Sequence, residues 1–252
     1  MRSIQRRLFQ VVRFLRQPGT AALAALCLCA LPAHAANLQI SPVSIAFQPA
    51  QAAAGINLQN FGDAPLYGQV RVYAWDQKDG IDVLVPTNDV VASPPIIEVA
   101  AGSTQTIRLV RRGAADAGAE RSYRILIDEI PRGEAASGVA IRLQYSVPVF
   151  VAPSAAAAAP ALAWSLARVN GDVVLRAANA GTLHAQVGAT RVRTAAGQDI
   201  EVSKGLLGYA LAGRTREWKL PKDKADALKG KMTVIATVNT REDSQPLAPV
   251  GD

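Results

Sequence analysis

Residues 139–151 read VAIRLQYSVPVFV, and every odd position of this 13-residue stretch carries an apolar or aromatic side chain. Alternation with a period of two residues is typical of a β-strand, so one face of this strand would be apolar along its whole length. The stretch is also longer than the usual strand of about five or six residues. At a sheet edge such a strand promotes aggregation unless another chain occupies it. The pattern therefore predicts a strand that requires a partner.

The first 35 residues have the composition of an export signal. Five arginines and no acidic residue accompany an apolar run over residues 20–30, and Ala33-His34-Ala35 fits the small-x-small pattern of a cleavage site. The run is interrupted by Pro32, whereas a membrane span needs about 20 continuous apolar residues. Arg6-Arg7 partly fits a twin-arginine signal, but nothing downstream suggests a cofactor inserted before export. We therefore expect residues 1–35 to be a signal peptide cleaved near Ala35, with no membrane insertion.

Removal of this leader changes the charge and the redox chemistry of the chain. Five of the 27 basic residues leave with it, so 22 basic residues face 20 acidic ones. The remaining arginines are spread along the chain, and no nucleic-acid partner is expected. Cys27 and Cys29 both lie in the leader. The mature protein would therefore contain no disulfide and would depend on packed cores for its stability.

Residues suited to catalysis or metal binding are few. His184 is the only histidine after the leader and no cysteine remains, which nearly excludes Cys/His zinc sites and histidine-dependent nucleophilic catalysis. The chain has no phosphate-binding glycine loop and no nucleophile-elbow or dinucleotide motif. Asp76, Asp79 and Asp82 lack the alternating spacing of a calcium loop, and Lys78-Asp79-Gly80 is better interpreted as a hairpin turn. We expect no catalytic residue, no cofactor and no bound metal.

The mature chain is a series of short strands separated by turn residues. Seven strands within about 115 residues is the spacing of an immunoglobulin-like sandwich. Residues 153–161 carry no strand or helix pattern and separate this block from a second one, in which Asn170-Gly171 is a strong hairpin signal. The first block is expected at 38–47, 54–58, 66–75, 81–85, 104–111, 122–130 and 139–151; the second at 162–169, 173–178, 186–192, 206–211, 216–220 and 232–238.

The predicted fold class is all-β, with two immunoglobulin-like β-sandwich domains in series after the signal peptide. The expected boundaries are an N-terminal domain with an edge strand that can be lent at 36–153, a linker at 154–161, a C-terminal domain at 162–241 and a disordered tail at 242–252.

The order and spacing of several motifs resemble those of the periplasmic pilus-assembly chaperones of chaperone-usher systems. The resemblance to this PapD-like family covers essentially the whole mature chain, and it is most specific for the branch that serves archaic or spore-coat-U-like fimbriae. The motifs are Ser41-Pro42-Val43, Leu58-Gln59-Asn60, Val72-Tyr73-Ala74-Trp75, Ser93-Pro94-Pro95, AGSTQTIR at 101–108, Glu129-Ile130-Pro131, LQYSVPVFV at 143–151 and, in the second half, Leu175 to Asn179 with Gly181.

This resemblance implies an ATP-independent periplasmic chaperone that binds pilin subunits by donor-strand complementation and delivers them to an outer-membrane usher. The donor-strand residues would be Val139, Ile141, Leu143, Tyr145 and Val147. Alternatively, these side chains fill the protein's own core, as some must in any sandwich. Self-association of the free chaperone through the same edge stays open.

A second family feature is altered in this chain. The resemblance implies that the pilin's C-terminal carboxylate is held by an arginine on the first strand and a lysine late on the last strand, but the aligned residues are Ser44 and Pro148. A charged donor is preferred for a buried carboxylate, so Arg124 and Arg108 are candidate substitutes. Alternatively, both arginines pair with Glu120 or Glu129. Pro148 removes a ladder donor and fits an edge strand or a bend.

The main alternative function is that of a secreted two-domain β-sandwich adhesin or carbohydrate-binding protein, in which loops would form the site. Only 5% of residues are aromatic, and this argues against a sugar site with flat stacking surfaces. An exported hydrolase is the least favoured possibility.

Overall fold

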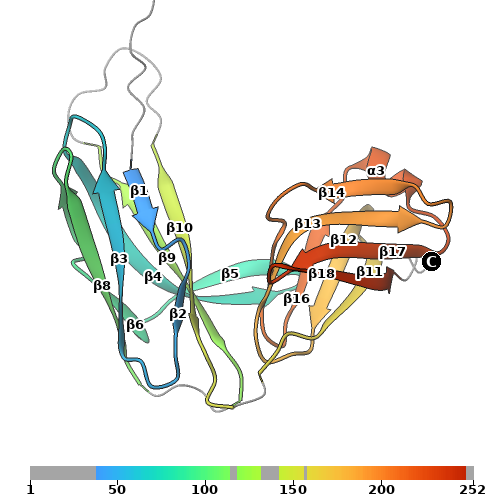
Figure 1. Cartoon of the computed structure of the whole chain (residues 1–252), viewed down its shortest axis with the longest axis horizontal. Helices are drawn as coiled ribbons and strands as arrows, with labels where there is room; N and C mark the ends of the chain where they lie inside the picture. Colours follow the sequence, from blue (N-terminus) through green and yellow to red (C-terminus); the bar gives the residue numbers. More distant parts are fainter. Residues whose placement is uncertain (1–37, 114–117, 132–141, 156–157, 248–252) are drawn as a thin grey trace, which may run out of the picture. The chain divides into compact units, whose positions relative to one another are not determined.

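The computed structural model describes residues 38–113, 118–131, 142–155 and 158–247 (Figure 1). Within these residues the secondary structure is β-strand apart from one short helix, α3 (Lys222–Ala227). The all-β prediction is therefore confirmed. The predicted signal peptide, residues 139–141 of the predicted donor strand and the last five residues lie outside the described part. No helix in the described part is long and apolar enough to cross a membrane.

The first sandwich consists of two sheets formed by residues 38–151 (Figure 1). One sheet has the strand order β1-β3-β8-β6, and the other has the order β2-β10-β9-β4-β5, with β7 also paired to β4. The strands are β1 (Leu38–Ser41), β2 (Ile45–Phe47), β3 (Ala53–Asn60), β4 (Leu66–Lys78), β5 (Ile81–Pro86), β6 (Val90–Ser93), β7 (Ile96–Val99), β8 (Thr104–Arg111), β9 (Arg121–Glu129) and β10 (Gln144–Val151).

The predicted strand at 38–47 is in fact two strands in different sheets. β1 ends at Ser41, which is joined to Pro42 by a cis peptide bond, and β2 begins at Ile45. Pro42 cannot donate a backbone hydrogen bond, so the ladder of β1 stops there. The chain then passes to the second sheet, where β2 runs parallel to β10.

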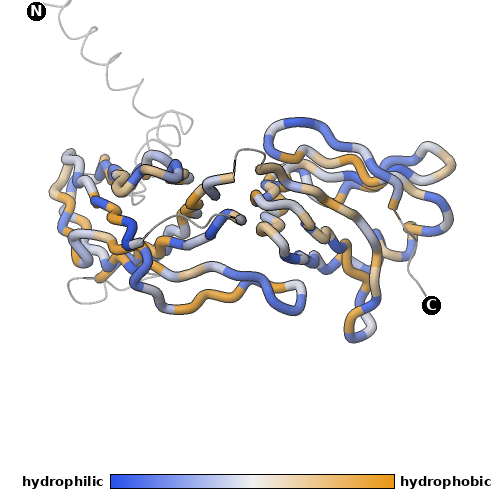
Figure 2. Tube along the Cα trace, turned by 90° about the horizontal axis from the view of Figure 1, so that it is seen from below, coloured by the Kyte–Doolittle hydropathy of each residue, from blue (hydrophilic) through white to orange (hydrophobic). Residues whose placement is uncertain are grey.

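The core of the first sandwich follows the two-residue period of its strands. Hydrophobic and hydrophilic residues alternate along the strands (Figure 2), and the apolar residues of most strands point between the two sheets. Strand β5 is an exception, since none of its residues is buried. Side chains such as Ile56, Leu58, Ile107 and Leu109 are completely buried. Burial of each such side chain contributes about 1.5–3 kcal/mol.

The second sandwich contains a three-stranded sheet of order β11-β12-β16 and a sheet of order β14-β13-β17-β18, with β15 also paired to β13. Its core is built around Trp164, Leu175, Val187 and Val234. Its strands are β11 (Leu162–Val169), β12 (Asp172–Asn179), β13 (Ala185–Thr194), β14 (Asp199–Ser203), β15 (Gly208–Ala210), β16 (Thr215–Lys219), β17 (Met232–Val238) and β18 (Arg241–Leu247).

Two predicted hairpin turns are present. Asn170 and Gly171, between β11 and β12, have φ angles of 51° and 85°. Asp79 and Gly80, between β4 and β5, have φ angles of 52° and 75°. Two consecutive residues with positive φ are characteristic of the type I′ turn, which matches the twist of the flanking strands.

The prediction of a disordered tail from residue 242 is wrong for residues 242–247. These residues belong to β18, which pairs with β17 from Val238↔Arg241 to Met232↔Leu247. The segment is polar and has little apolar periodicity, which concealed it in the sequence. As an edge strand it is held by its ladder with β17 and by burial of Leu247, which is 3% exposed.

Candidate functional site

Strand β10 is open along part of one side. It pairs with β9 over its whole length, from Gln144↔Asp128 to Val151↔Arg121. On the opposite side β2 pairs only with Val149, Phe150 and Val151. Within the described residues, the backbone of residues 144–148 therefore has no strand partner on that side. This is the exposed sheet edge that the sequence predicts, and it can accept a further strand.

The structure divides the five predicted donor-strand residues into groups. Val139 and Ile141 lie outside the described residues. Leu143 is half-buried immediately before β10, and its carbonyl oxygen accepts a hydrogen bond of 3.2 Å from the backbone N–H of Glu129. Tyr145 is half-buried against the first core, and burial raises the pKa of its hydroxyl.

The prediction that Val147 is lent to a partner is wrong. Val147 is 4% exposed and belongs to the core of the first sandwich, together with Val149 and Val151. From Val147 onward, the apolar face of β10 therefore packs against the opposite sheet and forms part of this protein's own core. Residues available to a partner must precede this packed portion of the strand.

The outer face of the sheet beside the open edge is polar. Asp128 of β9 accepts a 2.7 Å hydrogen bond from Arg71 of β4 and a further hydrogen bond from the Gln144 amide of β10. These bonds hold the pKa of Asp128 below its usual value. Arg71 also donates to the hydroxyl of Tyr73 at 2.9 Å. The face is thus an ordered array of hydrogen-bonding groups and differs in character from the apolar face of the same strands.

Arg124 lies on the same outer face, between Pro148 of β10 and Tyr73 of β4. Its guanidinium carbon is 3.7 Å from the centroid of the Trp75 ring and 5.3 Å from that of Tyr209. Burial lowers the pKa of Arg124. Among the described residues its guanidinium forms no ion pair, so the expected alternative pairing with Glu120 or Glu129 is absent. Arg124 is a partly desolvated cation held by aromatic rings, an environment that favours an anionic ligand.

Arg108 does not share this environment. It lies on β8, in the opposite sheet, where it faces Gly55 and Ser93 across the ladders and is exposed. The core of the first sandwich separates this sheet from the sheet that carries Arg124. The structure therefore does not bring the two candidate arginines together.

An aromatic cluster joins the two sandwiches and was not predicted from the sequence. Trp75 and Phe150 of the first sandwich pack with Tyr209 and Leu211 of the second. The imidazole of His184 stacks on the Phe150 ring at a centroid distance of 3.6 Å, and its Nδ1 lies 2.7 Å from the buried carboxylate of Glu120. No sequence pattern indicates this cluster, because its members lie far apart in the chain and on different elements.

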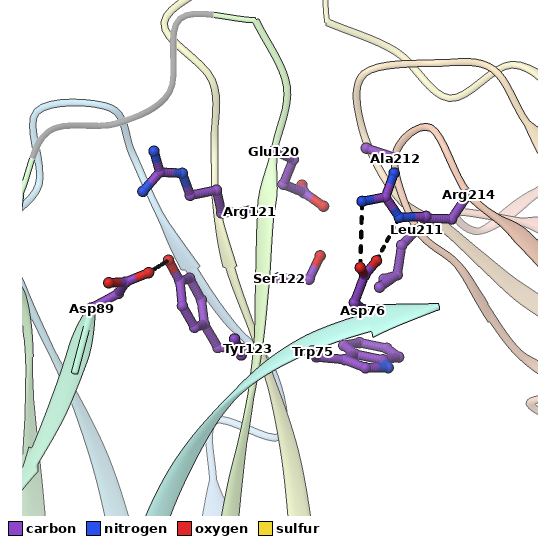
Figure 3. Close-up of a pocket in the computed structure, with 11 residues that line it drawn as sticks. Trp75, Asp76, Asp89, Glu120, Arg121, Ser122, Tyr123, Leu211, Ala212 and Arg214 are labelled. Atoms are coloured by element: carbon purple, nitrogen blue, oxygen red, sulfur yellow. Dashed lines mark hydrogen bonds and ion pairs between the residues drawn. The ribbon is translucent and has the colours of Figure 1, made fainter. Parts of the chain in front are cut away.

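A cavity of about 220 Å³ lies beside the cluster and is lined by residues of both sandwiches (Figure 3). Asp76 and Arg214 form an ion pair on one side of it (Figure 3), and the hydrogen bond from Arg214 holds the pKa of Asp76 below its usual value. Tyr123 donates a hydrogen bond of 3.2 Å to Asp89 at the other side of the cavity. The described residues contain no group of three or more metal-binding side chains.

Comparisons with known proteins match the first sandwich to a domain family and show which proteins share the fold. Residues 37–157 match the model of the pili and flagellar-assembly chaperones, PapD N-terminal domain. A search of curated proteins gave no significant match. Among solved structures, the chain is similar to a chain in the CsuC–CsuE chaperone–tip adhesion subunit pre-assembly complex from archaic chaperone-usher Csu pili of Acinetobacter baumannii. The TM-score is 0.69 with 23% identity, and the match covers 86% of this chain and 100% of that chain.

Two further solved structures have the same fold. The E. coli chaperone DraB matches with a TM-score of 0.55 and 19% identity, covering 84% of this chain and 96% of that chain. A structure of Salmonella enterica SafA pilin in complex with the SafB chaperone matches with a TM-score of 0.57 and 15% identity, covering 86% of this chain and 97% of that chain. The two sandwiches therefore have the fold of pilus-assembly chaperones. Within this fold, the first sandwich matches the PapD N-terminal domain of the pili and flagellar-assembly chaperones.

Proposed function

We propose that this protein captures a pilin subunit in the periplasm by adding a strand to it along the open edge of β10, and then delivers the subunit to an outer-membrane usher. The observation that carries this proposal is the edge of residues 144–148, which no other described strand covers. The alternating apolar sequence of residues 139–143 immediately precedes it. Strand addition at such an edge supplies backbone hydrogen bonds, and alternate side chains supply specificity.

We propose Val139, Ile141 and Leu143 as the donor residues, with Tyr145 at the boundary of the core. Complete burial of three such side chains contributes roughly 5–9 kcal/mol, at about 1.5–3 kcal/mol each. The cost of immobilising the two proteins opposes this gain. Backbone hydrogen bonds along the new ladder add to the gain. A dissociation constant of 1 μM corresponds to about −8 kcal/mol. Capture without ATP is therefore energetically reasonable.

Arg124 is the proposed anchor for the subunit's C-terminal carboxylate. Its position supports this role, because it is the cross-strand neighbour of Pro148 and shares the outer face of the sheet with it. Its environment also supports this role. The guanidinium is partly buried and has no ion pair among the described residues, so a carboxylate ligand would stabilise its charge. Arg108 lies on the other sheet, so it is not proposed as an anchor for the carboxylate.

Export to the periplasm through a signal peptide cleaved near Ala35 is part of the same proposal. Delivery to an usher and a role in assembling an archaic type of fimbria are supported by the likeness to the CsuC–CsuE complex, which comes from archaic chaperone-usher pili. The complexes of CsuC with CsuE and of SafB with SafA support a pilin or tip subunit as the partner.

The deciding experiment compares two neighbouring residues of the donor segment. Leu143→Asp would place an unpaired carboxylate in an apolar groove of the subunit, and such burial is strongly unfavourable. Arg142→Asp introduces the same charge one residue earlier, where a strand directs its side chain to the opposite face. After co-expression with candidate pilin subunits, the first variant should fold but lose the copurified subunit, and the second should retain it. Equal retention by both variants would contradict strand addition.

A further inference from the structure

The side chain of Gln77, near the end of β4, is a buried bridge between the two sandwiches. It is 4% exposed. Its Nε2 donates hydrogen bonds to the carbonyl oxygen of Tyr209 at 2.8 Å and to Asp82 at 2.9 Å. Its Oε1 accepts a hydrogen bond of 3.0 Å from the backbone N–H of Leu211. Both amide hydrogens and the amide oxygen are therefore used, and two of the three bonds cross from one sandwich to the other.

The geometry of these bonds depends on the amide group. A carbonyl oxygen at Tyr209 and an N–H at Leu211 flank Ala210, and the Gln77 amide meets both as a peptide group of an added strand would. A side chain with only acceptors cannot donate to the carbonyl, and an apolar side chain leaves both backbone groups unsatisfied in a buried place. The bridge therefore specifies glutamine at this position.

The neighbouring contacts place the whole tip of the β4–β5 hairpin against the second sandwich. The carbonyl oxygen of Gly80 accepts hydrogen bonds from the backbone N–H of Glu217 at 2.9 Å and from Arg216 at 2.6 Å. Gly80 is buried in this contact, and two more exposed ion pairs, Asp76–Arg214 and Asp82–Arg216, also join the hairpin to the second sandwich. Loss of the Gln77 amide would leave the hairpin attached by the Gly80 carbonyl and by these ion pairs.

The bridge also determines what lies beneath Arg124. Trp75 is two residues before Gln77 on the same face of β4, and its ring meets the Tyr209 ring at 5.4 Å in an edge-to-face arrangement. The Gln77 amide binds the backbone of Tyr209, so it fixes the second ring relative to the first. Arg124 lies over both rings. One of its two aromatic supports is thus provided by the other sandwich.

We propose that Gln77 is the positioning residue of the joint: its amide locks the second sandwich against the β4–β5 hairpin and thereby holds the Trp75–Tyr209 pair in place under Arg124. The part of this inference that concerns binding rests on the proposed function, because Arg124 is the proposed anchor of the subunit's carboxylate. The locking itself does not depend on any ligand.

The test is Gln77→Glu, which keeps the shape of the side chain but directs a carboxylate at the Tyr209 carbonyl and at Asp82. The matched control is Gln198→Glu, which makes the same change at an exposed hairpin turn of the second sandwich. Spin labels on cysteines introduced at Thr106 and Ala195, one exposed site in each sandwich, report the distance distribution between the sandwiches. The distribution should be narrow in the unmodified protein and in the control, and distinctly broader in Gln77→Glu at neutral pH.

Acidification provides a readout that a general loss of stability would not produce. A protonated glutamic acid regains one donor and can again bridge Tyr209 and Leu211, so the Gln77→Glu distribution should narrow as the pH falls through the range where the introduced carboxyl takes up its proton. Subunit binding by this variant at neutral pH should fall about tenfold or more, while the control binds normally. An unchanged distribution, or a broad one that acid does not narrow, would overturn the inference. Failure of the unmodified protein to bind any pilin would refute the proposed function and leave the distance result standing.

Discussion

Replacing Val147 by alanine tests where the donor strand ends and the protein's own core begins. The substitution removes two carbon atoms from a side chain that is 4% exposed in the first core. Lost transfer free energy accounts for about 1.6 kcal/mol at about 0.8 kcal/mol for each carbon. A cavity that relaxes only in part adds roughly 1 kcal/mol. The first sandwich should therefore lose about 2–3 kcal/mol of unfolding free energy.

The assay is equilibrium unfolding in urea followed by tryptophan fluorescence and by circular dichroism, so that separate transitions of the two sandwiches can be distinguished. A loss of this size lowers the Tm of a domain of this length by roughly 10 °C. Leu143→Ala is the matched control, because Leu143 is only half-buried before β10. It should lower stability by less than about 1 kcal/mol and should weaken subunit capture more than Val147→Ala does. A Val147→Ala variant with unchanged stability and lost capture would refute this division of the strand.

Three further substitutions test other parts of the structure. Arg124→Gln should weaken subunit capture about tenfold or more, whereas Arg108→Gln should leave it unchanged; equal effects in a pull-down would contradict the anchor assignment. Gly80→Ala should destabilise the joint more than Gly102→Ala in thermal unfolding, because both glycines have positive φ but only at Gly80 would the added carbon meet another side chain, at 2.6 Å from Glu217. Asp128 has a lowered pKa in the folded state, so its contribution to stability is present above the ordinary aspartate pKa and is lost as the pH falls through the folded value. Asp128→Asn should therefore flatten the acid side of the stability profile, and an unaltered profile would exclude this contribution.

The sequence predicted those parts of the fold that depend on local patterns. Strands such as β8 and β9 are recognisable by their alternation, and the Asn170-Gly171 turn by residues that accept positive φ. The same reasoning failed for β18, whose polar residues are ordered by pairing with β17 and not by an apolar face of their own. It also failed at Pro42, because the apolar positions change there from Leu38 and Ile40 to Ile45 and Phe47, and this shift of phase marks a change of sheet that the prediction of one strand ignored.

The candidate site was predictable only in part, because its two components differ in origin. The open edge of β10 follows from one continuous stretch of sequence. The joint under Arg124 arises when Trp75, Phe150, His184 and Tyr209 meet from separate elements. No periodicity within a single strand encodes such a meeting. As a consequence, Val147 and Leu143 occupy equivalent positions in the two-residue alternation but differ in burial. The pattern predicts which face of a strand is apolar, and it does not predict what covers that face.

The relation between Pro148 and Arg124 suggests how an altered anchor position can be compatible with carboxylate binding. The resemblance to the family implies a lysine late on the last strand, where this chain has Pro148. Arg124 is directly across the ladder from it on the same face, and neighbouring strands are about 4.8 Å apart. An arginine reaches further than this, and its planar guanidinium can stack on Trp75 while its edge still donates two parallel hydrogen bonds. A lysine at the same position would have no comparable stacking surface, so Arg124→Lys should preserve the charge but lose much of the binding that Arg124 provides. Full retention of subunit capture by Arg124→Lys would mean that charge alone, and not the stacked guanidinium, is what the subunit recognises.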